Sequence, residues 1–155
     1  MAFKRGMDFK LYRASSGAWG SEVWDEITIA SNISLKIEFA QLDATIRGIG
    51  HKLSEPGLAD MSIDFDLVFD HNHADFTALQ TAALAGTALI IAMATGTIGT
   101  AGTVASGGTA GEFFYKMQAK LFGWPWDAPL DGEGKVSLTF RPCYGTNVPV
   151  MTTVA

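Results

Sequence analysis

Apolar and polar residues alternate along several stretches of this chain, and the clearest case covers residues 59–70. Every second position there is apolar: Met61, Ile63, Phe65, Leu67 and Phe69. Most of the positions between them are polar or acidic: Ser62, Asp64, Asp66 and Asp70. Successive side chains of a β-strand point to opposite faces, so this pattern predicts a strand with one apolar face and one acidic face.

Shorter runs of the same kind predict further strands over residues 9–13, 27–30, 33–39, 42–46, 112–122 and 135–141. Residues 87–94 are apolar at almost every position, which is typical of a central strand with both faces covered. Segments rich in Gly, Ser, Thr or Pro separate the strands. They predict loops over residues 14–26, 47–58 and 95–111, and a C-terminal tail over residues 145–155.

A change of period over residues 74–85 predicts one short helix. Its apolar positions follow helical spacing: Phe76, Leu79, Ala83 and Leu84. Asn72 is the predicted N-cap, and Gly86 is the predicted C-terminal cap. Together these elements predict one mostly-β domain over residues 1–155, an antiparallel β-sandwich or barrel with one flanking helix.

The composition indicates that much of the surface is buried, either in an oligomer or in a membrane. Charged residues make up 17% of the chain, against about 25% in ordinary domains. A membrane span is not expected, because the uncharged segment over residues 76–111 has an apolar centre shorter than the roughly 20 residues that a spanning helix needs. The low charge therefore favours an oligomer. The net charge of −5 argues against a protein that wraps nucleic acid through its phosphates.

No group of residues in the sequence predicts an active site, so no catalytic, cofactor-binding or metal-ligating residues are expected. The segment DHNHAD over residues 70–75 has metal-binding residue types, but a helix that starts here would separate His71 from His73. Cys143, the single cysteine, has no His nearby in the sequence and is expected to be a half-buried small side chain. Four tryptophans in or near loops leave sugar binding as an alternative: Trp19, Trp24, Trp124 and Trp126.

The order of the elements resembles a known family. The strands and their connection read NISLKIEFAQLDATIRG and HKLSEPGLADMSIDFDLVFD, the helix segment reads DFTALQTAALAGTAL, and the last strand lies in LDGEGKVSLTFRPCYG. Over roughly residues 3–144 this resembles the major tail tube protein of long-tailed bacteriophages. The resemblance implies a non-enzymatic virion protein without cofactors, assembled in the bacterial cytoplasm and located in the tail.

The resemblance also implies partners. Six copies would form a ring, and stacked rings would form a hollow tube around a tape-measure protein, bounded by a tail terminator and by baseplate or tip proteins. The tube would conduct DNA without binding it specifically and without inserting stably into a membrane. The alternative within the same fold is the inner tube of a bacterial secretion or contractile injection apparatus.

Two sets of candidate contact residues follow. The lumen-facing candidates form the acidic row Asp64, Asp66 and Asp70, whose negative charge would keep phosphates from adhering. The candidates for contacts between rings lie in two long connections without a core role: His51, Lys52, Glu55 and Pro56 in the first, and Gly99, Gly102, Gly107 and Gly108 in the second.

Overall fold

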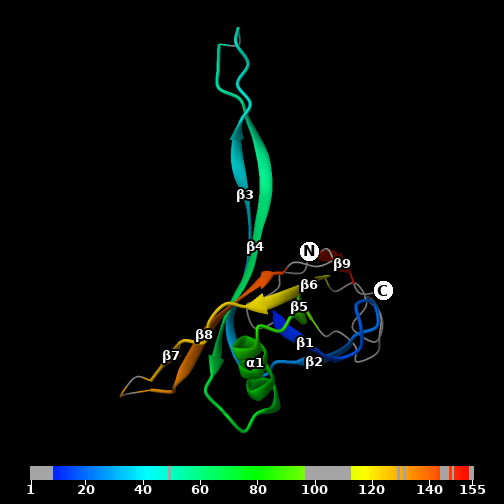
Figure 1. Cartoon of the computed structure of the whole chain (residues 1–155), viewed down its shortest axis with the longest axis vertical. Helices are drawn as coiled ribbons and strands as arrows, with labels where there is room; N and C mark the ends of the chain where they lie inside the picture. Colours follow the sequence, from blue (N-terminus) through cyan, green and yellow to red (C-terminus); the bar gives the residue numbers. More distant parts are fainter. Residues whose placement is uncertain are drawn as a thin grey trace.

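The computed structural model describes residues 9–48, 50–96, 113–128, 130, 132–143, 147 and 149–153. Its strands pair in the order β2-β1-β5-β6-β8-β4-β3, and β7 and β9 pair with β8 and β6 (Figure 1). The elements are β1 (Lys10–Ser16), β2 (Val23–Glu26), β3 (Ala30–Asp43), β4 (Ser54–Val68), α1 (Ala74–Ala85), β5 (Leu89–Ala94), β6 (Phe113–Leu121), β7 (Trp126–Asp127), β8 (Lys135–Pro142) and β9 (Val150–Thr153).

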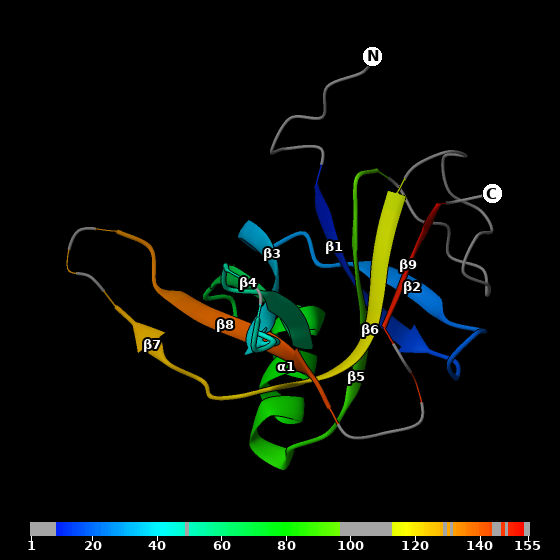
Figure 2. The same cartoon turned by 90° about the horizontal axis from the view of Figure 1, so that it is seen from above.

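The described strands form one antiparallel sheet that curls around its own core, seen along its length in Figure 2. The prediction of a mostly-β chain with one helix is confirmed. The change of direction occurs along β6, which pairs with β5 over most of its length and reaches β8 only at its end, Ala119–Leu121. The inner face of one curled sheet therefore encloses the core, which in a β-sandwich lies between two packed sheets.

The core is built on the apolar face of β4, the strand predicted to have one apolar face and one acidic face. Ile63, Phe65 and Leu67 of β4 are 0–2% exposed, and Phe65 stacks on Phe140 of β8 with ring centroids 5.2 Å apart. The same alternation buries every second residue of β8: Val136, Leu138 and Phe140. The period-2 pattern therefore predicted this part of the core residue by residue.

We expect Phe65→Ala to lower the free energy of unfolding by about 3–5 kcal/mol, because it leaves a cavity between β4 and β8. Phe39→Ala is the matched control. Phe39 is on β3 but is 60% exposed, so the isolated chain should lose about 0.5 kcal/mol or less. Urea denaturation of both variants measures the difference. Equal losses would contradict this assignment of the core.

Helix α1 has the predicted bounds, and Gly86 caps its C-terminus in the left-handed conformation, with φ 67°. The N-cap prediction was wrong. His73 is the N-cap, and its Nδ1 accepts a hydrogen bond from the backbone N–H of Asp75 at 3.2 Å. Asn72 lies in the preceding turn, where its backbone N–H donates to the Asp70 side chain at 3.1 Å.

Only part of the predicted apolar stripe of α1 is buried. Phe76 and Leu79 reach the core, as does Ala82, which the stripe left out. Ala83 is partly buried against the core, whereas Leu84 is 76% exposed. The twelve residues of α1 make about three turns, and only one face of the helix packs on the curled sheet. Apolar residues on its other faces therefore stay exposed.

The largest difference from the prediction lies in β3 and β4. The strands predicted over residues 33–39 and 42–46 form a single strand, β3, with an irregularity in its pairing between Phe39 and Gln41. The predicted loop over residues 47–58 ends early, because β4 already begins at Ser54. Pro56 and Gly57 were interpreted as turn residues, but both are also tolerated in an edge hairpin next to a β-bulge.

Three smaller differences concern short elements. The predicted loop over residues 14–26 contains the end of β1 and all of β2, and residues 27–29 form a turn instead of a strand. The sequence also gave no sign of β7, and β9 lies in the predicted tail. The predicted loop over residues 95–111 lies outside the described residues beyond Gly96.

A buried ion pair lies on the side of the sheet away from the main core. Strand alternation puts Lys116 on one face of β6 with Gln118 and Lys120, and there its side chain is 1% exposed, with its Nζ 2.8 Å from Oε1 of Glu22. The same oxygen accepts from the backbone N–H of Gly20 at 2.8 Å, and the ring of Trp19 lies over the ammonium at 4.1 Å. The loop over residues 17–22 thus covers this face of the sheet.

Candidate assembly surfaces

The β3–β4 hairpin extends far beyond the rest of the molecule (Figure 1). Strand β8 pairs with β4 only over residues 63–68, so residues 37–43 and 54–61 pair with each other alone among the described strands. We call residues 37–61 the arm. A two-stranded hairpin without a third strand is marginally stable in water, so a structure of this length calls for a partner.

The arm exposes large apolar side chains. Phe39 is 60% exposed, Leu42 55%, Ile46 62% and Leu58 89%. Four such side chains on one narrow hairpin are characteristic of an interaction surface. The sequence did not reveal them, because alternation shows which side chains share a face of a strand and does not show whether that face is covered. Only the separation of the arm from the body shows that this face has nothing to cover it.

The first set of predicted ring contacts lies on this arm. His51 and Lys52 are exposed in the connection between β3 and β4, and Glu55 and Pro56 are exposed at the start of β4. The second set lies outside the described residues: Gly99, Gly102, Gly107 and Gly108.

A second surface is the outward face of β3, β4 and β8, which we call the charged face. Asp64 and Asp66 lie on it, as predicted. Asp64 accepts a hydrogen bond from Thr139 at 2.6 Å and lies 3.5 Å from Nζ of Lys36. Asp66 accepts from Asn32 at 2.9 Å and from Ser137 at 2.7 Å. Residues of β3 and β8 therefore satisfy the two carboxylates of β4.

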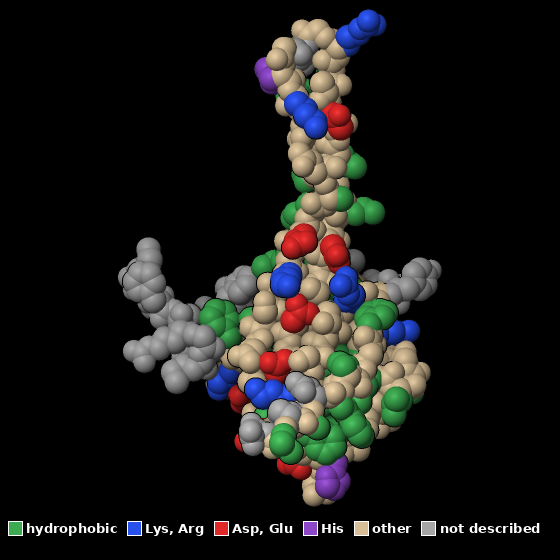
Figure 3. All heavy atoms as spheres, turned by 90° about the vertical axis from the view of Figure 1, so that its left-hand side faces the viewer, with side chains coloured by type: hydrophobic (Ala, Val, Ile, Leu, Met, Phe, Trp, Pro, Cys, Tyr) green, Lys and Arg blue, Asp and Glu red, His purple; other side chains and the backbone are tan. Residues whose placement is uncertain are grey.

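The charged face carries nearly balanced charge. Arg141 pairs with Asp60 at 3.2 Å, and a shallow depression of about 350 Å³ brings both together with Lys36, Glu38 and Asp64. Four carboxylates (Glu38, Asp60, Asp64 and Asp66) against three cations (Lys36, Lys135 and Arg141) leave a formal charge of −1. Figure 3 shows acidic and basic side chains interspersed below the arm. The row is thus less negative than the sequence of β4 alone indicated.

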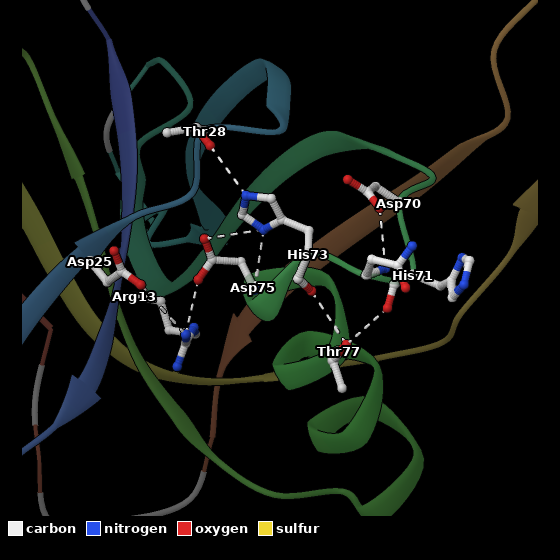
Figure 4. Close-up of polar contacts among 9 residues, drawn as sticks. Arg13, Asp25, Thr28, Asp70, His71, His73, Asp75 and Thr77 are labelled. Carbon is white, nitrogen blue, oxygen red and sulfur yellow. Dashed lines mark hydrogen bonds and ion pairs between the residues drawn. The ribbon is translucent and has the colours of Figure 1, made fainter.

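Asp70 does not continue this row. Strand β4 ends at Val68, and Asp70 lies in the turn before α1, beside His71 in Figure 4. The same view shows how the N-terminus of α1 is fixed to β1. Arg13 donates to the nearly buried Asp75 at 2.9 Å, and Nε2 of His73 lies 3.5 Å from the Thr28 hydroxyl.

Acid should weaken the charged face at Asp66. Hydrogen bonds from Asn32 and Ser137, with a smaller effect of Lys135, hold the pKa of this carboxyl below its ordinary value. A lowered pKa in the folded chain contributes stability above the pKa of the unfolded chain, near 3.9, and this contribution is lost as the pH falls through the folded value.

The test is urea denaturation of the parent and of Asp66→Asn between pH 7 and pH 3. Below about pH 4 we expect the parent to lose stability more steeply than the variant, because the variant has no carboxyl to protonate at this position. Parallel losses in the two proteins would contradict the assigned hydrogen bonds.

The described residues show packing rather than chemistry at the other candidate positions. They contain no group of three or more His, Cys, Asp or Glu that could hold a metal ion. The Cys143 thiol lies 3.7 Å from the carbonyl oxygen of Gln118. Trp24 is buried, and Trp124 packs edge-on against Phe76. No described helix is long and apolar enough to cross a membrane.

The comparison with known proteins rests on solved structures. No family model and no curated protein matches the chain. Among solved structures, a chain of the SPP1 tail tube superimposes with a TM-score of 0.71 at 11% identity, covering 97% of this chain and 80% of that one. The tail of an empty GTA particle, determined with C6 symmetry, gives 0.67 at 12% identity, covering 99% and 100%.

The chain has the fold of these tail proteins. A chain from the virion of a native gene transfer agent particle has a similar fold. It superimposes with a TM-score of 0.65 at 11% identity, and the match covers 99% of this chain and 100% of that one. The sequence-based resemblance to tail tube proteins is thereby confirmed for the fold. The tail-tube fold spans the described body and the arm together.

Proposed function

We propose that this chain is a structural virion protein whose copies form rings, and that the rings stack into a tail tube that conducts DNA into a host cell. The arm is the observation that carries this proposal. It is a two-stranded hairpin with exposed large apolar side chains, on a body with the tail-tube fold. Other copies of the chain would cover it.

Ring closure has a physical basis in the sheet. Strands β2 and β3 are the two edges of the described sheet order, and each has one side without a partner strand. An exposed edge presents backbone N–H and C=O groups that another strand can pair with. An edge-to-edge contact that repeats head to tail closes into a ring when the rotation fits, and the GTA tail with C6 symmetry supports six copies here.

The charged face suits the wall of a conduit. We propose that Asp64 and Asp66 face the bore and that Asp70 lies near its edge. A formal charge of −1 on this face gives DNA phosphates no cationic groove to bind. Ion pairs and hydrogen bonds within the face engage the carboxylates of Asp60, Asp64 and Asp66 without a ligand.

The remaining parts of the proposal concern contacts along the tube. His51, Lys52, Glu55 and Pro56 would contact the next ring, since they lie at the outer end of the arm. A tape-measure protein would occupy the bore during assembly in the bacterial cytoplasm, and a tail terminator and tip proteins would close the ends. The chain would have no enzymatic role.

Negative-stain microscopy of the purified protein over a range of concentrations tests the proposal. The expected result is hollow rings at low concentration and stacked tubes at high concentration, without any other protein. A chain that stays monomeric at every concentration in sedimentation experiments would overturn the proposal.

A further inference from the structure

We propose that protonation of His73 exchanges the N-cap hydrogen bond of α1 for an ion pair between His73 and Asp75. The contact between the start of α1 and the β1–β2 pair then responds to pH. The inference goes beyond the proposed function, because it concerns contacts within one chain and holds whether or not the chain forms tubes. Figure 4 shows the residues involved.

The first observation is that the N-cap contact requires a neutral imidazole. Nδ1 of His73 accepts a hydrogen bond from the backbone N–H of Asp75 at 3.2 Å, so the proton of the neutral ring is on Nε2. Nε2 lies 3.5 Å from the hydroxyl oxygen of Thr28, in the turn between β2 and β3. A proton on Nδ1 makes this atom a donor, and the Asp75 N–H then loses its acceptor. Imidazole is the side chain that ordinarily changes charge between pH 5 and pH 8.

The second observation is that an acceptor for the new proton is already in place. Nδ1 of His73 lies 3.7 Å from Oδ2 of Asp75, and a small rotation of either side chain brings the two atoms to hydrogen-bond distance. The imidazole is 30% exposed, so a proton can reach it from water, whereas the carboxylate is only 4% exposed. A charge pair that is shielded in this way attracts more strongly than a pair in water.

The third observation is that the cluster lacks one cation while His73 is neutral. Arg13 of β1 lies 2.9 Å from Oδ1 of Asp75 and 3.8 Å from Oδ2 of Asp25 on β2. One cation thus faces two carboxylates, a formal charge of −1. Protonation of His73 brings the cluster to zero, with two cations for two carboxylates. His73 can then pair with Asp75 while Arg13 pairs with Asp25.

The other titratable groups near the ring precede the helix. The side chain of Asp70 accepts from the backbone N–H of Asn72, and its carbonyl oxygen accepts from the N–H of His73, both at 3.1 Å. His71 is exposed, and its ring points away from His73 in Figure 4. His71→Asn therefore removes the neighbouring imidazole and leaves the cap in place, which makes it the matched control.

NMR of the isotope-labelled chain between pH 8 and pH 5 tests the loss of the cap, in solution for a dissociated chain and under magic-angle spinning for tubes. The amide proton of Asp75 should move upfield as the His73 ring is protonated, because it loses its hydrogen bond. The same shift should appear in His71→Asn and be absent in His73→Asn, since Asn caps a helix without titrating. A Asp75 amide that stays in place in the parent, or moves equally in His73→Asn, would overturn the inference.

The same spectra test the ion pair in the parent chain. At pH 5 the Nδ1 proton of His73 should give a visible signal, because its hydrogen bond to the nearly buried carboxylate slows exchange with water. The ring protons of the exposed His71 should exchange too fast to be seen. Loss of the cap without a protected Nδ1 proton on His73 would show that no ion pair replaces the hydrogen bond, and it would overturn the exchange.

Urea denaturation at pH 8 and pH 5 gives an independent measurement on the dissociated chain. In Asp75→Asn the protonated ring has no carboxylate to pair with. Between pH 8 and pH 5, its unfolding equilibrium constant should therefore rise about fivefold more than that of the parent, which corresponds to the roughly 1 kcal/mol of a typical N-cap. Asp70→Asn, the same change outside the pair, should follow the parent. Equal rises in Asp75→Asn and the parent would overturn the inference, and an Asp75→Asn chain that does not fold leaves the decision to the two NMR measurements.

Discussion

We expect removal of the outer part of the arm to raise the critical concentration for tube formation at least about 100-fold and to leave a folded body. The variant replaces residues 40–58 by Asn-Gly, a two-residue turn that joins the directly paired Phe39 and Ala59. The free energy of unfolding should change by about 1 kcal/mol or less, because the removed residues add no core contacts and a shorter loop costs less entropy to close.

The effect on assembly is much larger. Burying two of the exposed side chains of the arm is worth about 3 kcal/mol or more, so their loss raises the critical concentration for tubes at least about 100-fold. Pelleting of tubes at increasing protein concentration measures this. The control is Gln41→Ala, a polar change within the same arm, which should leave the critical concentration within about threefold. Normal tubes from the shortened chain would contradict the role of the arm.

We expect Lys116→Met to lower the free energy of unfolding by about 3–5 kcal/mol, a large fraction of the 5–15 kcal/mol that typically separates a folded domain from its unfolded chain. The substitution leaves the buried Glu22 carboxylate with one hydrogen bond, from the backbone of Gly20, and no cation. Its Oε2 has no partner among the described residues even in the parent. Lys116→Met also removes the cation under the Trp19 ring.

The double variant Glu22→Gln/Lys116→Met is the matched control. It removes both charges, keeps an oxygen that can accept from Gly20, and keeps an unbranched apolar side chain under Trp19. Replacing both members of a buried pair costs far less than removing one, so the double variant should recover most of the loss in urea denaturation. A single Lys116→Met variant within about 1 kcal/mol of the parent would contradict the buried pair.

Residues that are close in sequence were predictable. The alternation of β4 and β8 identified the buried Ile63, Phe65 and Phe140, because a strand carries its own period. The bounds of α1 followed from a local change of period and from Gly86, whose left-handed conformation ends the helix. These features depend on interactions within about four residues, which a sequence shows directly.

Features that depend on distant contacts were missed. Alternation along β6 shows only that Lys116 shares a face with Gln118 and Lys120, because its partner Glu22 lies 94 positions away in a loop that folds over the sheet. The balance of the charged face likewise depends on Lys36 and Arg141, which only the pairing of β3 and β8 with β4 brings to the acidic row. Local patterns show on which face of a strand a side chain lies, but they do not show what covers that face.

The arm illustrates the same limit for function. The sequence placed a contact surface near His51 and Lys52, on the grounds that a long connection without a core role serves another purpose. Residues 54–58 of that connection belong to β4, and its most exposed large apolar side chain is Leu58. Only the extension of the arm away from β8 shows that these apolar side chains are uncovered in the single chain.

Helical reconstruction by cryo-electron microscopy of tubes assembled from the purified chain tests the central claim most directly. The account predicts stacked rings in which the outer end of each arm contacts the next ring, with the exposed apolar side chains of the arm buried and with Asp64 and Asp66 facing the bore. A tube in which the arms extend into solvent while Asp64 and Asp66 lie on the outer wall would contradict it.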